Sequence, residues 1–215
     1  MFTFQISLGL ILSIPLFYWI CTSFLWGERS HYDEGEEISS FTVILPMRNE
    51  SKFVSQKIIS VIEEIEKEPE VSIMVIDSNS EDNTRDLAIK MLEETLLPRN
   101  RWDVIRLERP GKSYAINYAI EIVKSQVLIM SDADAIISKG WFHKTISWLS
   151  KKDVGAISGV EEISDSRRGF ETYYRDKADK LRIKESGIYS TPILEGSFLA
   201  FKKKCVEPFL LKENA

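Results

Sequence analysis

The chain has 215 residues, 44% of them hydrophobic, and a formal net charge of −5 at pH 7. This length suits one membrane anchor and one globular domain, and the acidic balance argues against a nucleic-acid-binding protein, because such proteins present a basic face. The two cysteines, Cys21 and Cys205, are too few for a disulfide framework or a cysteine-rich metal cluster, which is typical of a domain that faces the reducing cytosol.

The first predicted element is a membrane-spanning helix. Residues 2–26 contain no charged side chain, and at ~1.5 Å per residue a helix of that length exceeds the ~30 Å hydrocarbon core of a bilayer. A cleaved signal peptide is the alternative, but no Lys or Arg precedes the apolar run and no small-x-small cleavage site comes after it. We therefore expect a single-pass anchor over residues 1–27. Aromatic residues gather towards its end, as in an interfacial belt: Tyr18, Trp19, Phe24 and Trp26.

An acidic linker is predicted over residues 28–40, where no hydrophobic period is visible. Arg29 is the only Lys or Arg in this stretch, and the positive-inside rule, which gives acidic residues little weight, then favours the cytoplasm for the domain after the linker. We expect a membrane protein whose catalytic domain, residues 41–215, lies on the cytoplasmic side.

Strands and helices are predicted to alternate from residue 41 onward. Apolar runs predict strands over residues 41–45, 71–76, 104–107 and 127–130, the first of them ended by Pro46. Helical spacing of apolar residues predicts helices over residues 54–65, from an N-cap at Ser80 to Leu92, and from Gly111 to Val123. Strict alternation implies right-handed crossovers and an α/β fold with a mostly parallel sheet flanked by helices.

The pattern is less regular over residues 136–215. We expect a helix over residues 141–149, strands over residues 154–160 and 193–201, and between them an amphipathic helix within residues 168–186. In two-part α/β enzymes such a half commonly binds the second substrate. The aromatic and basic residues of the amphipathic helix predict that it borders the acceptor near the bilayer, and an ordinary core-packing helix remains the alternative.

Polar side chains come directly after all four of the first predicted strands. In open parallel sheets, ligands bind outside the carboxyl ends of the strands, so these side chains are expected to meet at one edge. Any one of them could simply form a cap or a turn, but four in a row favour a ligand site. The candidates are Pro46, Met47, Arg48 and Glu50 after the first strand, Asp77 and Ser78 after the second, Lys112 after the third, and Asp132, Ala133 and Asp134 after the fourth.

A nucleoside diphosphate fits the chemistry of these residues. The Asp77 carboxylate can accept hydrogen bonds from a base or a ribose, and Lys112, at the start of a helix with free N–H groups, suits phosphate. Asp132 and Asp134 would hold Mg²⁺ or Mn²⁺ against the diphosphate, since these ions keep water and phosphate oxygens as further ligands. Taken alone, an Asp-x-Asp pair more often belongs to a turn, and its place at the fourth polar strand end is the reason to favour the metal.

Five motifs in order resemble family 2 glycosyltransferases. Residues 42–50 look like the opening motif of that family, residues 76–84 are similar to its Asp-Asp-x-Ser-x-Asp-x-Thr loop, and residues 111–117 to its Gly-Lys-x-x-Ala-Leu-Asn segment. Asp132-Ala133-Asp134 matches its metal-binding Asp-x-Asp, and residues 196–203 resemble its later Gly-x-x-x-x-aromatic-Arg-Arg segment near the acceptor. The resemblance runs from about residue 41 to residue 209.

The resemblance implies a glycosyltransferase A-type, Rossmann-like fold in which residues 41–135 bind the nucleotide sugar and residues 136–215 form part of the acceptor-binding half. It implies inverting, metal-assisted transfer from a UDP- or GDP-linked sugar to a lipid-phosphate or glycan acceptor. Ser78 replaces the second Asp of the family's usual pair. The implied roles are a frame for the nucleotide from Pro46, Arg48 and Glu50, a base contact from Asp77, a base or phosphate contact from Lys112, a ribose and metal contact from Asp132, and direct metal coordination by Asp134.

The catalytic base is the open question. In the family it is an acidic pair that would fall beyond Ala215, and the late acids of this chain are Asp165, Glu195 and Glu213. An already ionised lipid phosphate would need no base. The alternative is a truncated, non-catalytic membrane module that binds a nucleotide sugar or pairs with another subunit. A nucleotidyltransferase is disfavoured, because the loop after the first strand is not glycine-rich.

Overall fold

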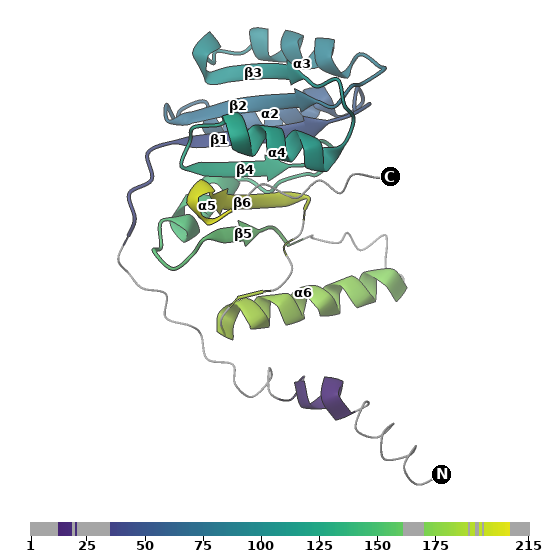
Figure 1. Ribbon diagram of the computed structural model, residues 1–215, viewed down its shortest axis with the longest axis vertical. Coiled ribbons are helices and arrows are strands. Elements are labelled where there is room, and N and C mark those ends of the chain that lie inside the picture. Colours follow the sequence, from purple (N-terminus) through teal and green to yellow (C-terminus); the bar gives the residue numbers. More distant parts are fainter. Residues whose placement is uncertain are drawn as a thin grey trace. The chain divides into compact units, whose positions relative to one another are not determined.

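The computed structural model describes residues 13–18, 20, 35–160, 170–188, 190–191, 194 and 196–206 (Figure 1). The chain divides into two units, Met1–His31 with Val160–Leu194, and Tyr32–Gly159 with Glu195–Ala215. The second unit holds the sheet and its helices. The first holds helix α6 (Phe170–Ile188), which matches the amphipathic helix predicted there and exposes Tyr173 and Tyr174.

Six strands form one mixed sheet in the order β3-β2-β1-β4-β6-β5. The neighbours β3, β2, β1 and β4 run parallel, which confirms the predicted parallel sheet. The last two strands reverse the direction, because β6 is antiparallel to β4 and β5 is antiparallel to β6. The strands are β1 (Phe41–Met47), β2 (Val71–Asp77), β3 (Trp102–Arg106), β4 (Val127–Ser131), β5 (Ala156–Ser158) and β6 (Phe198–Lys202).

Helices cover both faces of the parallel part. Helices α2 (Val54–Ile65), α3 (Thr84–Glu93) and α5 (Trp141–Leu149) pack on one face, and α4 (Lys112–Ile122) packs on the other, in front of β1 and β4 in Figure 1. Val43 and Leu45 of β1 point into the first core and Ile44 into the second, so the strand is apolar throughout. Two 3₁₀ turns, Arg99–Arg101 and Lys203–Cys205, complete the elements described.

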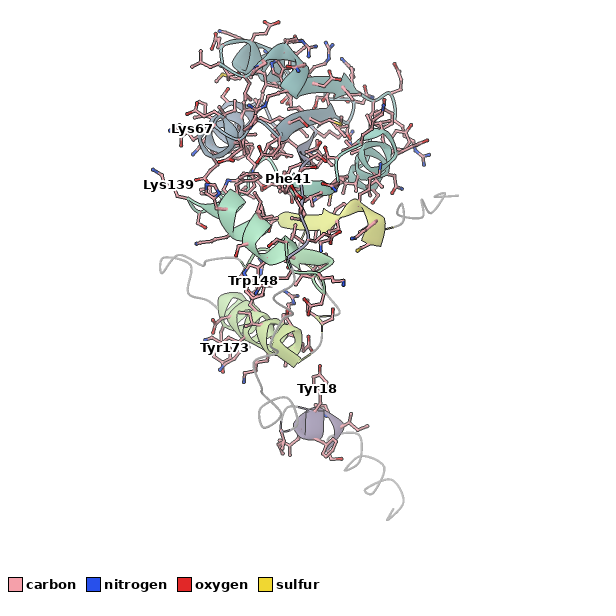
Figure 2. All side chains as sticks on the ribbon, turned by 90° about the vertical axis from the view of Figure 1, so that its left-hand side faces the viewer. Tyr18, Phe41, Lys67, Lys139, Trp148 and Tyr173 are labelled. Carbon is pink, nitrogen blue, oxygen red and sulfur yellow. The ribbon has the colours of Figure 1, made fainter. Side chains whose placement is uncertain are left out.

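Helix α5 confirms the predicted helix over residues 141–149 and is fixed by aromatic packing. The ring of Phe142 meets that of Phe41 edge to face at 5.4 Å between centroids, and the ring of Trp141 meets that of Phe198 at 5.6 Å. Phe41 therefore lies inside the molecule, whereas Lys67 and Lys139 stand at its surface (Figure 2).

The sequence pattern predicted that Pro46 would end the first strand, but the strand continues through it to Met47. Pro46 lies inside β1, paired in register with Ile76 of β2. The ladder between β1 and β4 stops at Ile44, so at Pro46 the strand is paired on one side alone. The missing N–H of proline can be tolerated there, because no partner strand on the β4 side requires it.

Two other expected boundaries differ. Ser80 is not the N-cap of the second predicted helix, because α3 begins at Thr84 and the Ser80 hydroxyl instead accepts a hydrogen bond from the backbone of Asn49 at 2.9 Å. The third strand covers Trp102–Arg106 and not residues 104–107. Leu107 leaves the strand, although its N–H still donates to the Asp77 carbonyl at 2.8 Å.

The strands of the later half are shorter than expected. The strand predicted over residues 154–160 is confined to β5, and the one predicted over residues 193–201 begins beyond Gly196, as β6. Sequence periodicity locates such strands but does not set their ends, because the ends depend on which neighbours they pair with.

The residues just before β1 are attached to the sheet unit. Gly35 forms a bridge with Lys151, and the Glu36 N–H donates to the Ser150 carbonyl at 2.6 Å. The Glu36 carboxylate accepts from the ammonium of Lys202, an almost fully buried residue, at 2.8 Å, and also pairs with Lys204. These two ammonium groups lower the pKa of Glu36 to about 2.

Among the residues described, no helix combines the length and the apolar character needed to cross a bilayer. The predicted anchor, residues 1–27, lies outside the described residues except for 13–18 and 20. The anchor and the membrane localisation that depends on it therefore stay predictions.

Candidate functional site

The carboxyl ends of the parallel strands bring the predicted polar loops to one edge of the sheet. Met47, the last residue of β1, lies in register with Asp77, the last residue of β2, and Asp77 lies in register with Arg106 of β3. β4 runs parallel to β1 on its other side and ends at Ser131, directly before Asp132. The side chains after these strands therefore face the same space.

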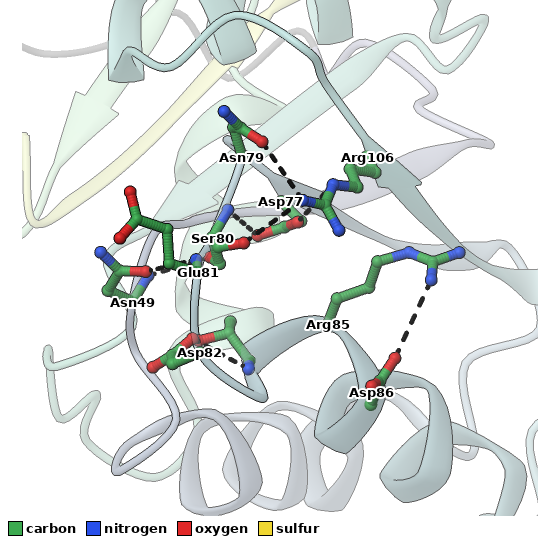
Figure 3. A network of polar contacts seen from close by, with 10 residues as sticks. Asn49, Asp77, Asn79, Ser80, Glu81, Asp82, Arg85, Asp86 and Arg106 are labelled. Carbon is green, nitrogen blue, oxygen red and sulfur yellow. Dashed lines mark hydrogen bonds and ion pairs between the residues drawn. The ribbon is translucent and has the colours of Figure 1, made fainter.

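The loop after β1 and the loop after β2 are bonded to each other (Figure 3). Asn49 adopts a left-handed conformation, with φ of 56°, and its side-chain oxygen accepts from the Glu81 N–H at 2.9 Å. The Glu50 N–H donates to the hydroxyl of the fully buried Thr84 at 2.7 Å. Together with the bond from Asn49 to Ser80, these contacts hold the two loops as one layer.

Asp82, in the loop after β2, also links the two loops through hydrogen bonds. Its carboxylate accepts from the backbone N–H of Thr84 at 3.0 Å and from that of Ser51 at 3.2 Å. Burial acts to raise the pKa of Asp82, but the hydrogen bonds from Thr84 and Ser51 outweigh it and lower that pKa to about 2. Asp82 is thus an ionised structural residue.

Asp77 carries an oxygen that the described structure does not satisfy. Its side chain is fully buried; Oδ1 accepts from the Ser80 N–H at 3.1 Å, while Oδ2 has no hydrogen-bond partner. Oδ2 forms a long ion pair with the Arg106 guanidinium, whose Nε lies 3.9 Å away (Figure 3). A buried carboxylate oxygen without a hydrogen bond is costly even with a guanidinium 3.9 Å away, so Oδ2 fits an acceptor for a ligand's donor.

Lys112 and Asp132 meet at the same edge. Gly111, with φ of 140°, turns the chain into α4, and Lys112 begins that helix. The Lys112 ammonium lies 2.6 Å from Oδ1 of Asp132. Gly196, just before β6, approaches so closely that a Cβ there would stand 3.7 Å from the Lys112 nitrogen.

Acidic side chains concentrate around this pair. Burial raises the pKa of Glu50, and the negative charges of Asp134, Asp132 and Asp82 raise it further, so these carboxylates share one region of negative potential. Within residues 35–160 and the other described stretches, no three His, Cys, Asp or Glu side chains converge as a complete metal site. Asp132 and Asp134 with diphosphate oxygens and water would still satisfy Mg²⁺ or Mn²⁺, which takes few protein ligands.

One functional candidate escaped the sequence interpretation. Lys57, on α2, is only 2% exposed, and its ammonium donates to the Ser131 hydroxyl at 2.6 Å and to the Ala135 carbonyl at 2.8 Å. Burial lowers the pKa of Lys57, the charges of Asp132 and Asp134 act to raise it, and the result is about 8. A lysine on the apolar face that carries Val54, Ile58 and Val61 was the feature that could have revealed it.

The other predicted residues differ in how far they are available. Arg48 is exposed and Pro46 is half-buried, whereas the side chains of Met47 and Ala133 pack in the core. The Met47 carbonyl accepts from the N–H of Ser78, itself buried. The candidate bases fall outside the described residues: Asp165, Glu195 and Glu213.

The mixed sheet with polar loops at the ends of its parallel strands defines an α/β fold of the glycosyltransferase A type. The chain belongs to glycosyl transferase family 2, which it matches over residues 42–209.

Solved structures support this placement. The mannosyltransferase PcManGT from Pyrobaculum calidifontis, in complex with GDP-Man and Mn²⁺, is 26% identical, with a TM-score of 0.73 over 88% of this chain and 52% of that one. Glucosyl-3-phosphoglycerate synthase from Mycobacterium tuberculosis, with Mn²⁺, UDP and phosphoglyceric acid, is 21% identical, with a TM-score of 0.51 over 77% of this chain and 56% of that one.

S. aureus TarS 1-349 in complex with UDP-GlcNAc is 19% identical, with a TM-score of 0.51 over 60% of this chain and 36% of that one. These last two similarities concern the fold alone. The chain spans about half the length of the mannosyltransferase. Comparison with curated proteins gives no significant match.

Proposed function

We propose that this chain is a glycosyltransferase that moves a sugar from a GDP- or UDP-linked donor to a lipid-phosphate or glycan acceptor, with inversion and with the aid of Mg²⁺ or Mn²⁺. The observation that carries the proposal is the convergence, on one sheet edge, of the Asp77 oxygen that has no hydrogen bond and the Lys112–Asp132 pair. Similarity to a mannosyltransferase bound to GDP-Man and Mn²⁺ makes GDP-mannose the first donor to test.

Each residue has a role that its position allows. Oδ2 of Asp77 would accept a hydrogen bond from the base, and the Lys112 ammonium would bind a phosphate oxygen beside Asp132. Asp132 and Asp134 would hold the divalent cation. When bound, that cation would supply the positive charge that stabilises the departing nucleoside diphosphate.

The acceptor is proposed on chemical grounds. Attack by a hydroxyl requires a base, whereas an ionised lipid phosphate can attack without one. The uncharged N-terminal stretch, residues 2–26, would keep a catalytic domain on the cytoplasmic side close to such a lipid. A glycan is the second proposed acceptor. Its attacking hydroxyl would need a catalytic base, and that base would come from outside the described residues.

Substitution Asp134→Asn tests the metal–diphosphate site. We expect the affinity for GDP or UDP in the presence of Mn²⁺, measured by titration calorimetry on the full chain, to fall by roughly 100-fold or more, since even groups that only support a metal ligand typically contribute ~10–100-fold. Asp86→Asn is the matched control, because Asp86 is an exposed residue on α3 whose side chain contacts Arg85.

Three outcomes separate the hypotheses. Loss of Mn²⁺-dependent binding in Asp134→Asn but not in Asp86→Asn, together with sugar transfer by the unmodified chain, supports the proposal. Binding without transfer to any lipid-phosphate or glycan acceptor would support the alternative of a non-catalytic nucleotide-sugar module. Equal nucleotide affinity in the unmodified chain and Asp134→Asn would contradict the assigned metal site.

A further inference from the structure

Lys57 occupies a position that the proposed chemistry does not explain. It projects from α2 into the space beneath the loop after β4, where it is almost completely buried. Its two hydrogen bonds go to Ser131, directly before the Asp132-Ala133-Asp134 motif, and to Ala135, directly after it. One ammonium group therefore donates hydrogen bonds to the residues on both sides of the motif and to neither of its carboxylates.

The hydroxyl of Ser131 extends this contact to β6. It accepts from the Lys57 ammonium and donates to the Ser197 carbonyl at 3.0 Å, while the Asp132 N–H donates to the same carbonyl at 3.1 Å. The residue before the motif is thus tied to α2 on one side and to the start of β6 on the other. The directions of these bonds are mutually consistent, since the single proton of Ser131 is used towards Ser197.

A buried ammonium is not an efficient way to stabilise a fold. Removing a lysine from water carries a large desolvation cost, and an apolar residue of similar volume often stabilises such a site equally well. The compensation available here is local: two short hydrogen bonds, and the negative charges of Asp132 and Asp134 nearby. A charge held at this cost, directly under the motif, points to a role in the motif's geometry.

We propose that Lys57 is a positioning residue, which fixes the loop from Ser131 to Ala135 so that Asp132 and Asp134 are held in the arrangement that receives the divalent cation and the diphosphate. This inference rests on the proposed function for its ligand. The geometric part, that Lys57 orders the loop, holds for the protein without any ligand and can be tested separately.

Substitution Lys57→Met keeps an unbranched apolar stem, one atom shorter, and removes both hydrogen bonds. In the ligand-free protein we expect amide hydrogen exchange over residues 132–136 to accelerate at least about tenfold, with the midpoint of thermal unfolding little changed. The dissociation constant for Mn²⁺ in the presence of GDP should rise about 10–100-fold, and saturating Mn²⁺ should restore most of the turnover.

Lys67→Met is the matched control, because Lys67 is an exposed lysine just past the end of α2. Ser131→Ala removes the contact of the hydroxyl with Lys57 together with its bond to the Ser197 carbonyl and leaves the bond from Lys57 to Ala135, so exchange and Mn²⁺ affinity should change in the same direction as in Lys57→Met. A double variant of Lys57 and Ser131 should then lose less than the sum of the single losses, because the two groups act through one contact.

The outcomes test the role of Lys57 separately from the proposed function. If exchange accelerates in Lys57→Met but the unmodified chain binds no Mn²⁺–GDP or Mn²⁺–UDP, the loop contact stands and the proposed function fails. If nucleotide binding is intact and neither exchange nor Mn²⁺ affinity differs from the Lys67→Met control, the inference about Lys57 is overturned. A lowered unfolding midpoint with unchanged Mn²⁺ affinity in the folded fraction would also overturn it, since Lys57 would then be structural only.

Discussion

Gly111 shows how one residue can determine the start of a functional helix. Its φ of 140° and ψ of 129° lie in a region that residues with a Cβ rarely adopt, and the next residue, Lys112, begins α4 beside Asp132. The space around it is permissive, because an added Cβ would meet only the Cβ of Tyr114, at an ordinary 3.9 Å. Backbone strain, and not crowding, is what reserves this position for glycine.

Substitution Gly111→Ala should therefore lower the free energy of unfolding by ~1–3 kcal/mol, the cost of holding an alanine at such dihedral angles. Urea unfolding followed by circular dichroism measures it. Gly35→Ala is a suitable control, because Gly35 has no positive φ and no atom within 4 Å of an added Cβ. Equal stability of the two variants would show that α4 can start without a glycine.

Asp77 illustrates what residue identity alone can predict. Asp77 follows an apolar run and precedes Ser80 in the sequence. This position was enough to predict that its carboxylate lies at the edge of a sheet. The missing hydrogen bond at Oδ2 and the ion pair with Arg106 were not visible in the sequence, because they depend on how β3 pairs with β2. Lys57 is similar: its helical face could be read from the sequence, but its contact with Ser131 spans 74 residues.

At the scale of elements, the loops after β1 and β2 behave as a single structure. Thr84, the first residue of α3, is the point where they join, because its hydroxyl accepts from the Glu50 N–H and also bonds to the Asp82 carboxylate. The loop after β1, the loop after β2 and helix α3 are thereby connected through one buried side chain.

Replacing that hydroxyl by a methyl group, in Thr84→Val, should destabilise the protein by ~1–3 kcal/mol, because the Glu50 N–H loses its acceptor beside a fully buried side chain and the Asp82 carboxylate loses one of its hydrogen bonds. Chemical denaturation gives the free energy, and amide exchange at residues 49–51 locates the effect. Thr84→Ser retains the hydroxyl and should behave nearly as the unmodified chain. If Thr84→Val also leaves stability and exchange unchanged, the hydroxyl does not join the loops.

The parallel strands could be predicted from the sequence, and the later strands β5 and β6 only in part, because strand burial leaves a pattern in the sequence and pairing direction does not. Strands β1 and β4 are buried on both faces and β2 is mostly so, and each therefore appears as an apolar run that stands out from the helices around it. β3 lies at the edge of the sheet and is partly exposed, which blurred its limits by two residues at its start. The direction of β5 and β6 has no counterpart in hydrophobic periodicity, because pairing direction is decided by tertiary structure.

At the scale of the whole molecule, Glu36 connects the entry of the sheet unit to its last strand. Glu36 and Lys202 are 166 residues apart in the sequence, and their contact gives an almost fully buried ammonium a negatively charged partner. Lys202 belongs to the segment that resembled an acceptor-side motif, but its ammonium is directed to Glu36 and the Lys151 carbonyl. The acidic stretch before β1 thus supplies a partner that the core requires.

This pair predicts a specific pH dependence. Because the pKa of Glu36 falls from an ordinary 4.5 to about 2 in the folded protein, its contribution to stability is present above pH ~4.5 and is lost as the pH falls towards 2. In Glu36→Gln, the free energy of unfolding should decline less steeply between pH 5 and 2 than in the unmodified chain, and should be lower at pH 7.

Urea unfolding at several pH values measures both quantities. Glu37→Gln controls for the loss of one negative charge at an exposed neighbouring position. Asp82 also has a lowered pKa and contributes in the same acidic range, so the comparison must be made between variants and not from the slope of the unmodified chain alone. Parallel curves for Glu36→Gln and the unmodified chain would rule out a role for the pair in acid stability.

The reversed direction of β6 bears on how such a molecule can diversify. Because β6 runs antiparallel to β4, its first residues, and not its last, arrive at the edge where the parallel strands end, and Ser197 is bonded there to Ser131 and Asp132. Substitutions in the residues that lead into β6 can therefore change the surface beside Lys112 and Asp132 while the loops after β1 and β2 stay intact. The direction of one strand thus brings a segment from late in the chain to the edge that the early strands form.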